Sequence, residues 1–133
     1  MLDKIEHLGI AVKNIDDGIK MYEQLLGGEC YKIEEVASQG VKTAFFMIGE
    51  SKVELLQATH ENSPIAKFIE KKGEGIHHVA YAVTGIEDKI KALEAQGFKM
   101  IHDMPKPGAD GKKIALLHPK STKGVLVELC EDR

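Results

Sequence analysis

The feature that most constrains the fold of this sequence is an internal repeat. Residues 7–23 align with residues 78–94 at an offset of 71, and eight of the seventeen aligned positions are identical. A segment that recurs within one chain is typical of proteins built from equivalent structural units. We therefore predict a single domain of 133 residues made of two similar modules, residues 1–60 and 75–133.

Each module predicts the element order β-α-β-β-β. An extended segment leads into a helix whose apolar side chains recur at helical spacing, and three further strand-like stretches follow. Gly27 and Gly97 are expected to end the two helices, because glycine readily adopts the left-handed conformation. Pro64 predicts a short helix over residues 63–72 between the modules. The expected strands are residues 4–12, 29–36, 43–48 and 52–57, then 75–83, 99–102, 112–118 and 125–130.

Composition excludes several classes of protein. The chain carries 18 basic and 21 acidic residues, a net charge of -3, and therefore has no general electrostatic attraction to nucleic acid. No apolar run approaches the roughly 20 residues that a membrane helix needs. Cys30 and Cys130 have no metal-type or redox-type spacing and are expected to be reduced thiols. We expect a cytoplasmic protein with no nucleic-acid or membrane partner.

The strand that opens each module carries a histidine on a face of small residues. Because alternate side chains of a strand point to opposite faces, His7 shares its face with a glycine and an alanine. In the second module His78 shares its face with two alanines, whereas His77 points to the other side. A histidine followed by small residues favours a hollow surface over a packed core.

A glutamate recurs near the end of each module, between a valine and a leucine. These residues, Glu54 and Glu128, are costly to bury without a partner. If the modules pair about a pseudo-twofold axis, both glutamates and both histidines converge on one cavity. Imidazole and carboxylate ligands suit Co, Ni, Zn, Mn or Fe, so we predict a divalent metal site formed by His7, Glu54, His78 and Glu128. Taken singly, each histidine could be a hydrogen-bonded structural residue and each glutamate a salt-bridged one. The unrepeated His60, His102 and His118 are expected to be structural.

Paired modules with this His…Glu pattern resemble the vicinal oxygen chelate superfamily, which includes glyoxalase I, extradiol dioxygenases, antibiotic-resistance proteins and methylmalonyl-CoA epimerases. The epimerases are the most similar members, and the resemblance covers nearly the whole chain. It implies an α+β fold in which the two modules form a curved mixed sheet around a central metal cavity. The segments that carry it are residues 7–12, 53–56, 63–69, 75–78, 108–112 and 118–129.

The resemblance also implies an activity: interconversion of (2R)- and (2S)-methylmalonyl-CoA through a metal-stabilised enolate, in propionate metabolism. Cobalt is the expected metal, with Ni, Zn or Mn as alternatives, and a homodimer is the expected assembly. Epimerisation needs a base on each face of the planar enolate. Certain epimerases have a glutamate at the position of Thr43, and threonine cannot remove a carbon-bound proton. We therefore expect Glu128 to be one acid/base and Glu54, or metal-bound water, to be the other.

The substrate partner implied is a CoA thioester, and its anionic groups need local cations. Candidates lie around the glycine-rich loop and the turn before the last strand: Lys112, Lys113, Lys120, Ser121, Thr122 and Lys123. A solvated surface charge is an equal alternative for each lysine. Lactoylglutathione lyase (glyoxalase I) is the main alternative function, because it uses the same ligands. A non-catalytic small-molecule-binding protein of the same fold is another, and the short length disfavours a ring-cleaving dioxygenase.

Overall fold

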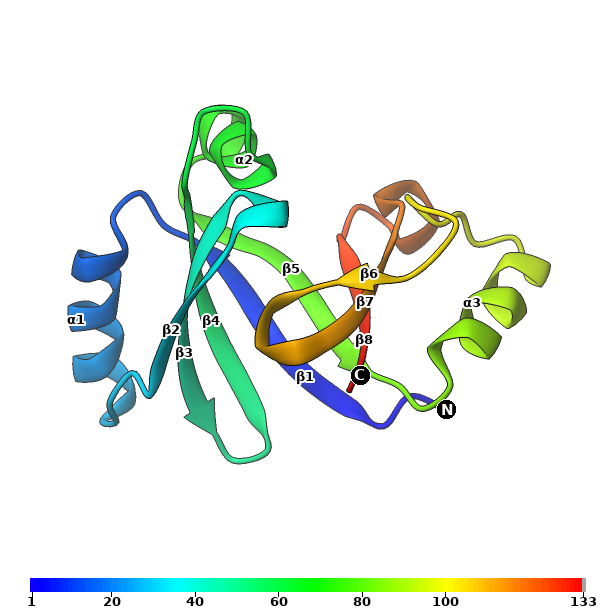
Figure 1. Cartoon of the computed structure of the whole chain (residues 1–133), viewed down its shortest axis with the longest axis horizontal. Coiled ribbons are helices and arrows are strands. Elements are labelled where there is room, and N and C mark those ends of the chain that lie inside the picture. Colours follow the sequence, from blue (N-terminus) through cyan, green and yellow to red (C-terminus); the bar gives the residue numbers. More distant parts are fainter. Residues whose placement is uncertain (133) are drawn as a thin grey trace. The chain divides into compact units, whose positions relative to one another are not determined.

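The computed structural model describes residues 1–132, so Arg133, the end of the second predicted module, lies outside the described residues. Figure 1 shows the course of the chain. The first module contains β1 (Lys4–Ala11), α1 (Ile15–Leu26), β2 (Lys32–Val36), β3 (Val41–Ile48) and β4 (Ser51–Ala58). Helix α2 (Pro64–Lys72) follows. The second module contains β5 (Gly75–Ala82), α3 (Ile86–Ala95), β6 (Lys106–Pro107), β7 (Lys112–Leu117) and β8 (Val127–Asp132). No helix in residues 1–132 is long and apolar enough to span a membrane.

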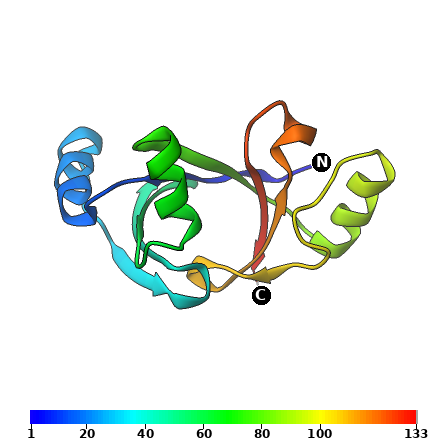
Figure 2. The ribbon, with the colours of Figure 1, turned by 90° about the horizontal axis from the view of Figure 1, so that it is seen from above.

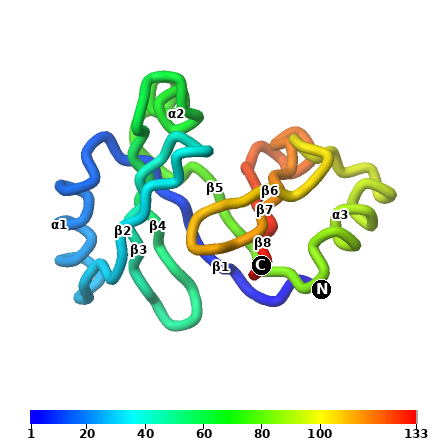
Figure 3. The backbone as a smooth tube through the Cα atoms, viewed as in Figure 1, coloured from blue at the N-terminus to red at the C-terminus, as the bar shows by residue number. Residues whose placement is uncertain are grey.

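The predicted order of elements and the α+β fold class are confirmed. The strands of the first module neighbour one another in the order β2-β3-β4-β1, and only the β1–β4 pair is parallel. The second module repeats this pattern as β6-β7-β8-β5, with β5 parallel to β8. The same path can be followed along the tube in Figure 3. Contacts divide the chain into two compact units, a first unit of residues 7–77 and a second unit of residues 1–6 with those from 78 onward.

Helices α1 and α2 pack against the strands of the first unit. Figure 2 shows α1 in blue and α2 in green. Because residues alternate along a strand, Val53 and Leu55 of β4 pack toward α1 while Leu56 contributes to a different cluster. Helix α1 adds Ile15 to the first cluster, and α2 adds Ile65 to the second. The strands therefore bury both faces within this unit.

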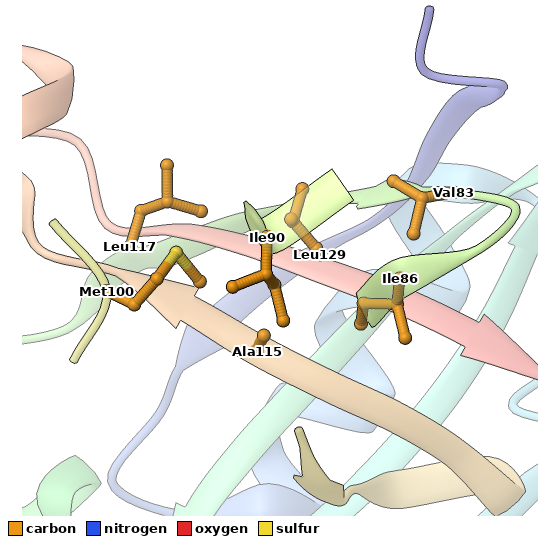
Figure 4. Packing of buried hydrophobic residues seen from close by; sticks show 7 residues of the cluster. All are labelled: Val83, Ile86, Ile90, Met100, Ala115, Leu117 and Leu129. Atoms are coloured by element: carbon orange, nitrogen blue, oxygen red, sulfur yellow. The ribbon is translucent and has the colours of Figure 1, made fainter. Parts of the chain in front are cut away.

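The second unit has its own apolar core between α3 and strands β7 and β8. Figure 4 shows these side chains directed toward one another. Ile86 and Ile90 lie four residues apart on one side of α3, the spacing that places two side chains on the same face of a helix. The seven buried members are Val83, Ile86, Ile90, Met100, Ala115, Leu117 and Leu129.

A side chain from the last strand of each module anchors the start of that module's helix. Oε1 of Gln57 accepts a hydrogen bond from the N–H of Ile15 at 2.7 Å. The carboxylate of Glu131 accepts bonds from the N–H groups of Gly85 and Ile86. These acceptors satisfy donors that the first turn of a helix leaves unpaired. The repeat thus extends to the contacts that fix each helix on its sheet.

One expected strand, residues 99–102, does not form. Only Met100 makes a bridge there, to Leu117, before the chain leaves the sheet. Pairing with β7 resumes at Lys106 in the two-residue strand β6. Pro105, which has no N–H to donate to a ladder, stands between the bridge and β6.

Replacing the anchor of α3 should destabilise the protein. We expect Glu131→Ala to lower the free energy of unfolding by about 1–2 kcal/mol, because two N–H groups lose their acceptor. Glu131→Gln should cost less, since an amide oxygen fills this role at Gln57 in the first module. Urea denaturation measures both, and an unchanged midpoint for Glu131→Ala would contradict the anchoring role.

Candidate functional site

The first unit places a histidine beside a glutamate on one face of its sheet. Strands β1 and β4 are parallel, and Gly9 lies level with Glu54, so His7 and Glu54 face the same side. Nδ1 of His7 lies 3.2 Å from Oε2 of Glu54. The two residues are only 5% and 4% exposed. A buried imidazole and a buried carboxylate therefore lie side by side on one face of this strand pair.

The second unit repeats the arrangement with His78 and Glu128. Here β5 is parallel to β8 and Ala80 lies level with Glu128. Nε2 of His78 lies 3.6 Å from Oε1 of Glu128, and the residues are 7% and 6% exposed. The repeat in the sequence is thus a repeat of a buried histidine–glutamate pair.

Each pair has the chemistry of two ligands to one divalent cation. Bonds of about 2.0–2.2 Å at octahedral or tetrahedral angles put neighbouring ligand atoms about 2.8–3.6 Å apart. The His7–Glu54 distance lies within this range, and the His78–Glu128 distance lies at its upper end. Imidazole nitrogen and carboxylate oxygen are donors suited to Co, Ni, Zn and Mn. Each pair, taken by itself, therefore fits a metal of this class by donor type and spacing.

Two further buried polar residues lie on the same face of the first unit, and sequence reasoning did not include them in the site. Lys52 stands two residues before Glu54, lies level with His7 and is 8% exposed. Thr43 of β3 is fully buried and lies level with Leu56. Two-residue spacing from Glu54 was the available signal for Lys52, because residues two apart on a strand share a face.

The remaining histidines have other surroundings. The ring of His77 packs edge-on against Phe68 of α2 at 5.0 Å, and burial lowers the pKa of His77 to about 4. Nδ1 of His60 accepts a hydrogen bond from the backbone N–H of Asn62. His102 contacts the ammonium of Lys106 at 3.2 Å, and His118 accepts from the backbone N–H of Lys120.

The lysines proposed for substrate binding fall into two groups. Lys112 forms an ion pair with Asp132, and Lys113 donates to Glu87 at 2.8 Å. This hydrogen bond lowers the pKa of Glu87 and raises that of Lys113. Lys120 and Lys123 follow the other end of β7, a strand of six residues and so about 20 Å long. The structure does not bring the two groups together.

The side-chain hydroxyl groups of the turn over residues 119–122 form hydrogen bonds with main-chain groups of the protein. Oγ of Ser121 accepts from the N–H of Lys99 at 2.9 Å. The hydroxyl of Thr122 contacts the carbonyl oxygens of Pro119 and Val125. Both side chains therefore support the turn that carries Lys120 and Lys123.

The sequence of this chain is similar to a known protein family and to several known proteins. The profile of the Glyoxalase/Bleomycin resistance protein/Dioxygenase superfamily matches residues 6–116. The chain is 42% identical over 132 residues to an uncharacterized protein of Bacillus subtilis, covering 99% of this chain and 94% of that one. It is 37% identical over 131 residues to the mitochondrial methylmalonyl-CoA epimerase of Dictyostelium discoideum, covering 98% of this chain and 79% of that protein.

Among solved structures, a variant of Streptomyces coelicolor methylmalonyl-CoA epimerase in complex with 2-nitronate-propionyl-CoA is similar, with a TM-score of 0.95. It is 33% identical in sequence, and the match covers 99% of this chain and 96% of that one. The fold is therefore that of the proteins with paired β-α-β-β-β modules. The chain belongs to the glyoxalase/bleomycin resistance protein/dioxygenase superfamily, which confirms the resemblance.

Metal binding should depend on the paired histidines. We expect Co²⁺ to raise the melting temperature of chelator-treated protein, because a ligand that binds only the folded state stabilises it. His7→Asn and His78→Asn should each weaken Co²⁺ binding by at least about tenfold. Isothermal titration measures the affinities, and His102→Asn is the matched control. Equal affinities in all four proteins would refute the ligand assignment.

Proposed function

We propose that the protein is a methylmalonyl-CoA epimerase, which removes the α-proton of the thioester and returns it to the opposite face. The observation that carries this proposal is the pair of buried glutamates, Glu54 and Glu128, one in each module and each beside a histidine. Similarity over 98–99% of this chain to proteins named methylmalonyl-CoA epimerase supports the choice of substrate.

The proposed metal ligands are His7, Glu54, His78 and Glu128. A bound divalent cation supplies a Lewis acid for the negative charge that develops on the thioester oxygen. Cobalt is the metal we propose, and nickel, zinc and manganese share its preference for these donors. Each imidazole lies close to the carboxylate of its own module, at 3.2 Å in the first and 3.6 Å in the second.

The proton transfers are assigned to the glutamates. Glu128 is proposed to hold the proton on one face of the planar enolate and Glu54 on the other, so that inversion needs one group from each module. Both side chains are almost completely buried, which limits the water available to protonate the enolate at random. Thr43 takes no part in proton removal, because an alcohol is too weak a base.

The anionic substrate needs cations that the net charge of -3 does not supply. Lys52 is a buried cation on the face of Glu54 and is proposed to balance negative charge near the reacting carbon. Lys120 and Lys123, with the turn supported by Ser121 and Thr122, are the proposed contacts for the CoA phosphates. Lys112 is a weaker candidate, because Asp132 already pairs with it.

Proton exchange with solvent tests the proposed reaction directly. Metal-loaded protein incubated with methylmalonyl-CoA in deuterated water should place deuterium on the α-carbon, since the enolate returns a proton drawn from solvent. Mass spectrometry of the recovered thioester measures the label. A parallel reaction with methylglyoxal and glutathione should yield no S-lactoylglutathione. Product in that reaction without label in the first would identify a lactoylglutathione lyase instead.

Removing either proposed base should stop the exchange. Glu128→Gln and Glu54→Gln keep the size of the side chain but cannot accept the α-proton, and a loss of about 10²–10⁴-fold is expected. The assay is run at saturating metal, with bound metal measured in each variant, to separate lost basicity from lost binding. Glu70→Gln, on the exposed side of α2, is the control. Near-normal exchange in a metal-loaded variant would remove that glutamate from the role.

A further inference from the structure

Thr43 is the exception among the buried polar side chains. Its side chain is fully buried in β3. Of the buried side-chain nitrogen and oxygen atoms in residues 1–132, its Oγ1 is the one without a hydrogen-bond partner. Buried hydroxyl groups are normally hydrogen-bonded, because leaving one unpaired costs free energy. A structural role in packing alone would be served better by valine, which has the same shape and no hydroxyl.

The second module shows that packing at this position does not require a polar residue. Thr43 lies level with Leu56, two residues after Glu54. The equivalent position in the second module is Ile114, which lies level with Cys130, two residues after Glu128. Ile114 is buried among apolar neighbours. The hydroxyl at Thr43 is therefore a specific feature of the first module rather than a property of the repeat.

The Thr43 side chain lies on the face of the sheet that also carries Glu54. Thr43 shares its face with Phe45, which lies level with Glu54, so Thr43 and Glu54 are diagonal neighbours. Such neighbours are about 7–8 Å apart, a span that one bound group can bridge. On the outer side, Thr43 lies level with Glu34 of the edge strand β2, whose long side chain forms a 3.5 Å ion pair with Lys32. Both of those side chains are about one-third exposed.

We propose that the Thr43 hydroxyl donates a hydrogen bond to the free carboxylate of a bound malonyl-type acyl group, and so selects malonyl-type thioesters over simple acyl thioesters. A hydrogen bond to a charged acceptor is stronger than one to a neutral acceptor, so the carboxylate gains most from this donor. The carboxylate is also the group that distinguishes such a substrate from other CoA esters. The ligand class rests on the proposed function.

Binding measurements test this role without requiring turnover. Dissociation constants of malonyl-CoA and acetyl-CoA are measured for metal-loaded wild-type protein and for Thr43→Val. We expect the variant to bind malonyl-CoA about tenfold more weakly and acetyl-CoA unchanged, because only the first ligand carries the carboxylate. Its melting temperature should equal or exceed that of the wild type, since an unpaired hydroxyl has been removed. Thr43→Ser, which keeps the hydroxyl, should retain the preference for malonyl-CoA.

Thr59→Val is the matched control, because Thr59 is exposed after β4. If Thr43→Val binds malonyl-CoA as tightly as the wild type, or weakens both ligands equally, the proposal is overturned. A Thr43→Ser variant that loses the preference for malonyl-CoA over acetyl-CoA overturns the proposal as well. If Thr43→Val does not fold, the result for Thr43→Ser alone tests the proposal. A wild-type protein that prefers malonyl-CoA but exchanges no α-proton would remove the proposed epimerase activity and leave the role of Thr43 intact.

Discussion

The structure depends on the pairing of a buried imidazole with a buried carboxylate, once in each module. Each glutamate lies in a strand between two apolar residues, so the main chain that forms the core also carries the carboxylate out of water. That transfer is costly unless the charge meets a partner. The parallel pairing of β1 with β4, and of β5 with β8, brings the partner histidine to the same face.

The last strand of each module consequently makes three kinds of contact: with the apolar core, with the histidine and with the start of the helix. The alternation of side chains along the strand places the histidine contact on one face and the other two on the opposite face. In β4, Val53 and Leu55 pack toward α1, Glu54 faces the other way toward His7, and Gln57 returns to the helix side to hold the first turn. In β8, Leu129 packs in the core, Glu128 faces His78, and Glu131 holds α3. A shift of the register by one residue would exchange the core and polar faces and so destroy all three contacts at once.

Sequence patterns predicted those parts of the molecule that follow local rules. Alternation along a strand placed His78 rather than His77 on the polar face, and the repeat located both glutamates. The strand expected at residues 99–102 is reduced to the single bridge of Met100 with Leu117, because the extent of pairing with β7 is a tertiary property that local propensity does not encode. Nor could spacing show that Lys112 is paired with Asp132, since that contact depends on the register of β7 against β8.

The two modules match in their histidines and glutamates but differ in the residues around them. Two residues before the glutamate, the first module has Lys52 and the second has Leu126. On the neighbouring strand, the first module has Thr43 where the second has Ile114. The repeat therefore fixes the histidine–glutamate pair in each module, whereas Lys52 and Thr43 make the polar face of the first module chemically different from that of the second.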